Sequence, residues 1–233
     1  MGDVLEASLN EIYMFDAQTL RFEYVNAGAQ RNLGYSSDDM HAMTPLDLKP
    51  ELSVAAFAEL IGPLRRHEKE KIVFQTPHRR ADGSLYPAEV HLQLFERGGK
   101  PVFLAIINDI TERKLAERRS DGERRVLELI AGGAPLVKVM DELTRECAEL
   151  CAGAMCSVLL LDADGRHLRH GAAAGLPADY VAAIDGIEIG SCVGSCGTAA
   201  HTGRTVIVSD IAIDPLWADC KELALPRGLR ACS

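Results

Sequence analysis

Three strand-like segments between residues 71 and 110, separated by two short glycine-containing turns, constrain the fold of this chain most strongly. Residues 71–80, 85–96 and 101–110 carry the segments, and the turns between them read ADGS and RGGK. Turns this short join neighbouring strands that run antiparallel. The sequence therefore predicts an antiparallel sheet in which consecutive strands pair.

The preceding residues predict the rest of this first unit. Apolar and polar residues alternate over 11–26 around a polar turn, which indicates a β-hairpin. Two short helices are expected over 27–43, the first ended by Gly34. A longer helix is expected over 53–70, where apolar residues recur on one face. Together these elements predict a five-stranded antiparallel sheet with helices on one face.

Residues 111–131 change the character of the chain, because they are highly charged with sparse apolar positions. We predict a connecting helix, interrupted or frayed at Asp121–Gly122. Two interpretations stay open for this helix. It either transmits a signal, paired with a second copy as a short coiled coil, or it is a solvated spacer between domains.

A second α+β unit is predicted after the connector. It opens with an amphipathic helix on which Cys147 and Cys151 share a face and are expected in the core. The later elements are a buried strand, a return strand, a short helix, a Gly/Cys loop that opens a helix, a strand and a last helix, over residues 155–162, 167–175, 177–184, 190–203, 205–211 and 215–229.

The bulk composition excludes several classes of protein. The 233 residues carry a formal net charge of −9, which argues against a nucleic-acid-binding face. We find neither an apolar run long enough for a membrane span nor a secretion leader. The seven cysteines are odd in number, which favours reduced thiols over a disulfide framework. We therefore expect a cytoplasmic protein without a membrane segment.

The first unit resembles a PAS domain. The resemblance rests on LGYS at 33–36, on TPLDLKPE at 44–51, and on the closing strand that runs into Asp-Ile-Thr-Glu-Arg-Lys at 109–114. It implies a sensor domain in which Asp109, Ile110 and Thr111 relay a signal to the connector. Candidate residues for a ligand cavity are apolar and equally suited to a plain core: Met14, Phe22, Met43, Phe57, Ile61, Phe74 and Leu92.

The second unit resembles a GAF domain. The resemblance rests on Val193–Ala200 (VGSCGTAA), on VIVSDI after it, and on Pro215-Leu216-Trp217. Domains of this family continue with further strands and a closing helix, so we expect a C-terminally truncated GAF-like domain. The predicted organisation is a PAS-like domain over 1–110, a helical linker over 111–131 and the GAF-like domain over 132–233.

The Gly/Cys loop admits several functions. Cys192, Cys196 and Cys220 offer thiols for a metal, but one loose C-x₃-C pair lacks the second pair that zinc requires. A redox pair formed by Cys192 and Cys196 is a second possibility. The third is a small anion or cyclic nucleotide at the helix N-terminus, capped by Ser195; its contacts would be Ser195, Cys196, Gly197 and Thr198. The alternative is a capped helix that binds nothing.

Cofactor signals are absent from the sequence. Residues 27–70 hold no cysteine for a flavin adduct, and no Cys-His pair marks a bilin site. His41 and His67 are the histidines available in this insert for haem, and His67 sits in a charged run. We assign no cofactor, no metal and no catalytic residue, and predict that this chain is not an enzyme.

These observations predict a sensory input region from a bacterial signal-transduction protein. The resemblance implies an output module outside this chain, either a histidine kinase of a two-component system or an enzyme of cyclic-di-GMP signalling (a diguanylate cyclase or phosphodiesterase). We expect a homodimer and allow a small-molecule ligand. The alternative function is a ligand-free dimerisation scaffold, since folds of this kind serve both roles.

Overall fold

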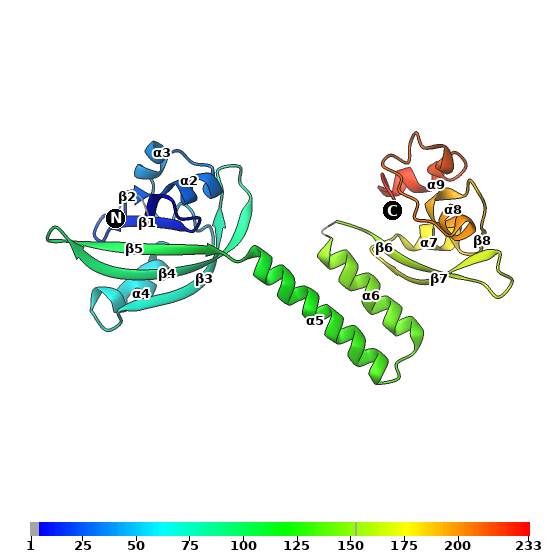
Figure 1. Cartoon of the computed structure of the whole chain (residues 1–233), viewed down its shortest axis with the longest axis horizontal. Helices are drawn as coiled ribbons and strands as arrows, with labels where there is room; N and C mark the ends of the chain where they lie inside the picture. The colour runs from blue at the N-terminus through cyan, green and yellow to red at the C-terminus, as the bar shows by residue number, and fades with distance from the viewer. Residues whose placement is uncertain (1–4, 152) are drawn as a thin grey trace. The chain divides into compact units, whose positions relative to one another are not determined.

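The computed structural model describes residues 5–151 and 153–233, which divide into two compact units. One unit ends at Leu115 and the other begins at Ala116, so the break falls inside one helix (Figure 1). Residues 1–4 of the predicted first domain lie outside the described part of the chain. Among the described residues, no helix is both long and apolar enough to cross a membrane.

The first unit is built on the predicted antiparallel sheet. Its described strands are β1 (Glu11–Asp16), β2 (Phe22–Val25), β3 (Lys71–Arg79), β4 (Leu85–Arg97) and β5 (Lys100–Asp109), in the spatial order β2-β1-β5-β4-β3. Every neighbouring pair runs antiparallel. The two glycine turns join β3 to β4 and β4 to β5, as the sequence predicts.

In the described part of this unit, three helices pack on the sheet: α2 (Ala27–Leu33), α3 (Ser37–His41) and α4 (Val54–Arg65). Side-chain caps fix where they begin: Ser36 starts α3 with a capping box, and Ser53 accepts a hydrogen bond from the first turn of α4. Gly34 ends α2 in the left-handed conformation. Their apolar residues join those of the strands in a single core.

The pairing of β1 decides which of its side chains face that core. Tyr13 and Phe15 point inward, where Phe15 stacks on Phe103 with ring centroids 5.1 Å apart. Because side chains alternate along a strand, Met14 lies on the opposite face, beside the Arg97 side chain. Met14 was expected among the cavity-lining residues, and the structure separates it from the others.

Gly28 is a site where a small change has a large predicted effect. A Cβ atom there would lie 2.6 Å from the Ser8 carbonyl oxygen and 2.8 Å from that of Asn10. Both oxygens belong to backbone, which cannot rotate away. We expect Gly28→Ala to destabilise the first unit by about 1–3 kcal/mol, measured by urea unfolding followed by circular dichroism. An unchanged midpoint would show that the Ser8–Asn10 segment is free to move.

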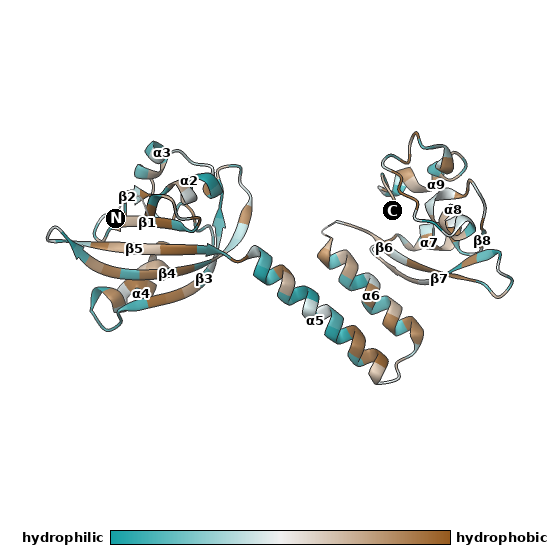
Figure 2. Ribbon diagram, viewed as in Figure 1, coloured by the Kyte–Doolittle hydropathy of each residue, from teal (hydrophilic) through white to brown (hydrophobic). Residues whose placement is uncertain are grey.

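The connector α5 (Thr111–Ala131) is one continuous helix, so the predicted interruption at Asp121–Gly122 is wrong. The glycine is buried because the Glu146 carboxylate lies across it, and that carboxylate pairs with Arg125. Gly122 therefore makes room for a partner side chain and does not break the helix. Hydropathy changes along α5 from hydrophilic to hydrophobic (Figure 2).

In the second unit the larger part of α5 is followed by α6 (Leu136–Leu150), which packs on a sheet of described order β6-β7-β8. The strands are β6 (Cys156–Leu161), β7 (His167–Ala174) and β8 (Ile187–Glu188), and the helices α7 (Ala178–Ile184) and α8 (Gly194–Thr202) precede and follow β8. These elements confirm an α+β unit. A small core elsewhere in the unit joins residues from α7 onward: Tyr180, Val208, Ile211, Trp217 and Ala224.

Three details of this unit differ from expectation. The strand β6 is half-exposed where a buried strand was predicted, since among the described residues it pairs on one side only. Cys147 and Cys151 are exposed and not in the core, although they lie on the same stripe of α6 as the buried Met140. Residues 205–211 form only a single bridge, between Val208 and Cys232.

The predicted helix over 215–229 is broken into short pieces. They are η1 (Pro215–Trp217), α9 (Lys221–Ala224) and η2 (Leu225–Arg227). Pro226 lacks the N–H that an α-helix needs there and crowds the preceding turn, so α9 ends before it. Gly228 then closes the segment in the left-handed conformation.

Candidate functional site: a buried polar network that reaches the connector helix

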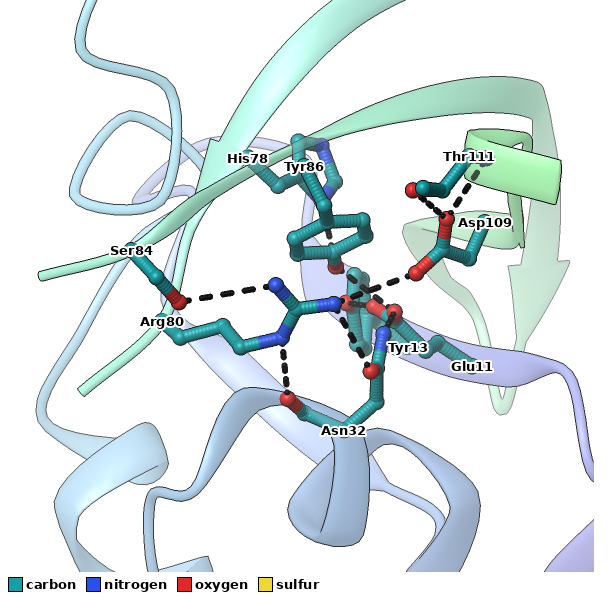
Figure 3. A network of polar contacts seen from close by, with 9 residues as sticks. All are labelled: Glu11, Tyr13, Asn32, His78, Arg80, Ser84, Tyr86, Asp109 and Thr111. Carbon is teal, nitrogen blue, oxygen red and sulfur yellow. Dashed lines mark hydrogen bonds and ion pairs between the residues drawn. The ribbon is translucent and has the colours of Figure 1, made fainter. Parts of the chain in front are cut away.

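A buried carboxylate lies at the centre of the first unit's polar contacts (Figure 3). Glu11, at the start of β1, is 2% exposed. It accepts hydrogen bonds from the hydroxyls of Tyr13 and Tyr86, the latter at 2.6 Å, and from the Asn32 amide at 2.5 Å. Burial raises the pKa of Glu11, and these hydrogen bonds oppose the rise. Three protein donors thus surround a buried carboxylate.

Two basic side chains are buried near this carboxylate. Lys49 is 3% exposed, and its ammonium donates one long hydrogen bond, 3.4 Å, to the Pro45 carbonyl. Desolvation lowers the pKa of Lys49 to about 7, against the attraction of Glu11. Burial, and then the Lys49 charge, lowers the pKa of His78 to about 2, so this imidazole is neutral at physiological pH.

The ring of His78 has one satisfied nitrogen. Its Nδ1 lies 3.2 Å from the Tyr86 hydroxyl oxygen, whereas Nε2 has no hydrogen-bond partner among the described residues. Because the Tyr86 hydroxyl donates to Glu11, its oxygen accepts from Nδ1–H. Nε2 is then a bare acceptor in a fully buried position. Such an atom is an available contact for a hydrogen-bond donor.

Arg80 connects this buried network to the end of the sheet. Its guanidinium donates to the Asn32 carbonyl at 2.9 Å and to the Asn32 side-chain oxygen at 3.2 Å. The same group reaches the Asp109 carboxylate at 3.1 Å (Figure 3). It also lies over the Tyr86 ring, 4.1 Å from the centroid. The planar, multi-donor guanidinium therefore bridges three elements at once.

The predicted relay residues lie at the start of α5. One oxygen of Asp109 accepts from the Thr111 backbone N–H at 2.9 Å and from its hydroxyl at 2.6 Å. Ile110 is buried, and its N–H donates to the Pro87 carbonyl at 3.0 Å. A continuous path of hydrogen bonds thus runs from Glu11 through Asn32, Arg80 and Asp109 to the first turn of α5.

A groove of about 470 Å³ opens beside this path. Glu11, Asn32 and Asp109 contribute to its walls, together with Arg31 and Asn108. A larger groove of about 720 Å³ lies elsewhere on the unit and is lined by residues such as Arg65 and Leu94. Neither groove is lined by the apolar residues that the sequence suggested for a ligand cavity.

Those apolar residues, Met14 apart, meet in the core. Phe22, Phe57, Ile61 and Leu92 are buried there, and two more, Met43 and Phe74, are partly buried against it. These residues therefore belong to one packed core. Whether they also line a ligand cavity stays a prediction.

In the second unit the Gly/Cys loop begins α8, but Ser195 does not cap it. Among the described residues no side-chain cap precedes this helix; Ser195 is buried inside it and accepts a hydrogen bond from the Trp217 indole at 3.0 Å. The Thr198 hydroxyl accepts from the Val193 N–H at 3.2 Å, which helps to close the loop. Gly197 packs against the Val193 side chain, and Cys196 is exposed.

Metal binding finds no support in the described part of the chain. No group of three or more histidine, cysteine, aspartate or glutamate side chains there could hold an ion. His41 and His67, considered above for haem, are both exposed.

Sequence reasoning missed most of the polar network: Glu11, Tyr13, Asn32, Lys49, His78, Arg80 and Tyr86. One signal was available. Alternate residues of β1 point to opposite faces, and both faces carry apolar side chains, so hydropathy alone does not show which face is buried. Glu11 lies on the same face as Tyr13 and Phe15. If that face is the buried one, Glu11 is a buried carboxylate. The pairing of His78 opposite Tyr86 depends on the register of β3 and β4, which turn length could have suggested.

Comparison with known proteins identifies both units. Residues 10–112 match the family model of the PAS domain, and residues 135–233 match that of the GAF domain. A curated relative, the methyl sulfide methyltransferase-associated sensor of Methanosarcina acetivorans, is 42% identical over 137 residues. That match covers 59% of this chain and 14% of the relative, so the chain spans a small part of its length.

Solved PAS structures also resemble part of the chain. A PAS domain from a two-component sensor histidine kinase is 19% identical with a TM-score of 0.39, over 46% of this chain and 90% of that one. The PAS domain of an HTR-like protein from Haloarcula marismortui is 26% identical with a TM-score of 0.42, over 46% and 91%. The two family matches, in chain order, show that this protein carries a PAS domain followed by a GAF domain, both of them sensory domain families.

Proposed function

We propose that this chain is the sensory input region of a larger signalling protein. A ligand or partner at the PAS domain changes the polar network, and α5 carries the change onward to an output module. Histidine kinases and the enzymes of cyclic-di-GMP turnover are the outputs we propose, in a cytoplasmic homodimer of bacterial type. The proposed boundaries are 1–110 for the sensor, 111–131 for the linker and 132–233 for the GAF domain.

One observation carries this proposal: the hydrogen-bonded path from the PAS core to the connector. Asp109 uses one carboxylate oxygen for Arg80 and the other for Thr111. A shift of Arg80 therefore alters the capping of α5 directly. A packed core with discrete hydrogen-bonding arrangements can convert a small local change into a change of helix position or population.

The buried Nε2 of His78 is the contact we propose for a ligand. A small molecule with a hydrogen-bond donor would donate to this nitrogen. It would also compete for the space around Tyr86, whose hydroxyl donates to Glu11. The core residues suggested by the sequence would form the apolar walls of this site. The relay then begins at Tyr86 and Glu11 and ends at Asp109.

A ligand-free dimerisation scaffold is the second candidate, and exposed apolar side chains favour it. Leu127 and Ile130 on α5 are 64% and 56% exposed, and Leu136 and Val137 on α6 are 63% and 55% exposed. Such side chains commonly mark association surfaces. In this alternative the two helices join copies of the chain and the PAS core plays no part.

Hydrogen exchange can separate the two functions in the chain itself. We expect Arg80→Gln to speed amide exchange over residues 111–115 about fivefold, since a weakened cap costs about 1 kcal/mol. Arg79→Gln is the matched control, because Arg79 is exposed and its guanidinium donates to the Asp47 carbonyl at 3.1 Å, away from Asp109. In the intact parent protein, Arg80→Gln should shift basal output and Arg79→Gln should not. Equal exchange and equal output in both variants would refute the relay.

A further inference from the structure

Two distant cysteines meet beside the small core of the GAF domain. Cys232 is placed by two backbone hydrogen bonds with Val208, of 2.7 and 2.9 Å. Cys196 is placed by its neighbour Ser195, whose hydroxyl accepts from the Trp217 indole at 3.0 Å. Val208 and Trp217 belong to one hydrophobic cluster, and Cys232 packs against it. The first turn of α8 and the segment around Cys232 are therefore anchored on the same support.

The two thiol groups interact directly. A side-chain hydrogen bond joins Cys196 to Cys232, and a second joins Cys232 to Ser195. Cys196 is exposed and Cys232 is half-buried, so small reagents can reach the pair. All seven cysteines are free thiols in this structure. Cys192, the other cysteine of the C-x₃-C pair, is outside this contact.

We propose that Cys196 and Cys232 form a reversible disulfide, which makes this corner of the GAF domain a thiol–disulfide redox site. The co-reactant is a low-molecular-weight disulfide of the glutathione class. This inference does not depend on the sensory proposal, because the chemistry can be measured in the isolated chain.

The Cys232 thiolate attacks one sulfur of the reagent disulfide, forms a mixed disulfide and releases one thiolate. Cys196 loses its proton to solvent and attacks the Cys232 sulfur, which releases the second thiolate. The protein loses two protons and two electrons, and the reagent disulfide is reduced to two thiols. The reverse sequence restores the free cysteines.

The acidities of the pair suit this order of attack. The hydrogen bond from Cys196 lowers the pKa of Cys232, against the effect of burial, which favours Cys232 as the attacking thiol. The same hydrogen bond, with burial, raises the pKa of Cys196. Once Cys232 is in a mixed disulfide it carries no charge, so Cys196 becomes easier to ionise for the second step.

The test is disulfide mapping of the whole chain after equilibration in buffers of graded reduced-to-oxidised glutathione. Free thiols are trapped by alkylation, and the digest is analysed by mass spectrometry. We expect a peptide pair that links Cys196 to Cys232 and that disappears in the reducing buffers. Trp217 fluorescence should change with the same redox midpoint, because its indole contacts Ser195.

Variants make the assignment specific. Cys232→Ser and Cys196→Ser should both abolish the linked peptide and the fluorescence change, whereas Cys192→Ser in the same loop should retain both. The wild-type map needs no variant, so a folding defect in one variant leaves the test intact. A chain whose Cys196 and Cys232 stay reduced or only glutathionylated in the most oxidising buffer would overturn the proposal, as would a link confined to Cys147, Cys151 and Cys156.

Discussion

Replacing Glu11 with alanine should destabilise the PAS domain by about 3–5 kcal/mol, the effect expected when one member of a buried, charged network is removed. The truncation leaves the Tyr13 hydroxyl and the Asn32 amide without their acceptor. It also removes the carboxylate that opposes the desolvation of Lys49. Each buried group left unsatisfied costs about 1–3 kcal/mol, so the sum lies in the stated range once partial relaxation is allowed.

The measurement is urea unfolding followed by circular dichroism, with tryptophan fluorescence recorded in parallel. The sequence contains one tryptophan, Trp217, and it is buried in the GAF domain. Its transition should stay in place while the PAS transition moves. Glu23→Ala, at an exposed position of β2, is the matched control and should lie within about 0.5 kcal/mol of the parent. If Glu11→Ala behaves like Glu23→Ala, the network adds no stability.

The PAS fold was accessible from sequence because its determinants are local. The glycine turns dictate antiparallel neighbours, and Ser36, Ser53 and Gly34 mark helix ends through contacts within one turn. These signals act over a few residues, so no knowledge of tertiary packing is needed to interpret them. The same holds for Gly203, which ends α8 in the left-handed conformation.

The polar network depends on contacts that local patterns do not encode. Glu11 and Tyr86 are 75 residues apart, and their hydrogen bond forms only when β1, β5 and β4 pair in the observed register. Ser195 illustrates the same limit in the GAF domain. It has the residue type and position of a helix cap, yet its hydroxyl accepts a hydrogen bond from the Trp217 indole instead.

Gly122 shows how a local propensity is overridden. Glycine is unfavourable inside a helix by about 1 kcal/mol relative to alanine, which is why a break was predicted in α5. The Glu146 carboxylate occupies the space that a side chain would fill and pairs with Arg125. The ion pair between α5 and α6 offsets the low helix propensity of this glycine. That pair is visible only once the two helices are packed together.

Acid should destabilise the PAS domain through His78, by about 2 kcal/mol between pH 6.5 and pH 4.5. The folded-state pKa of His78 is about 2, against 6.5 for a free side chain. In this pH range His78 therefore binds a proton in the unfolded chain and stays neutral in the folded domain. The contribution of His78 to the free energy of unfolding is fully present well above pH 6.5. Below that pH it falls with a slope that approaches about 1.4 kcal/mol for each pH unit. Glu11, whose pKa is raised, acts in the opposite direction as the pH falls toward 4.5.

The His78 contribution is isolated by comparing slopes between variants. His78→Gln keeps an N–H donor for the Tyr86 hydroxyl but does not titrate, so its free energy of unfolding should fall less with acid than that of the parent. His67→Gln, at an exposed position, should follow the parent curve. Urea midpoints at pH 6.5, 5.5 and 4.5 provide the comparison. Parallel curves for the parent and His78→Gln would mean that the buried imidazole accepts its proton without unfolding, through local opening of the core beside Lys49.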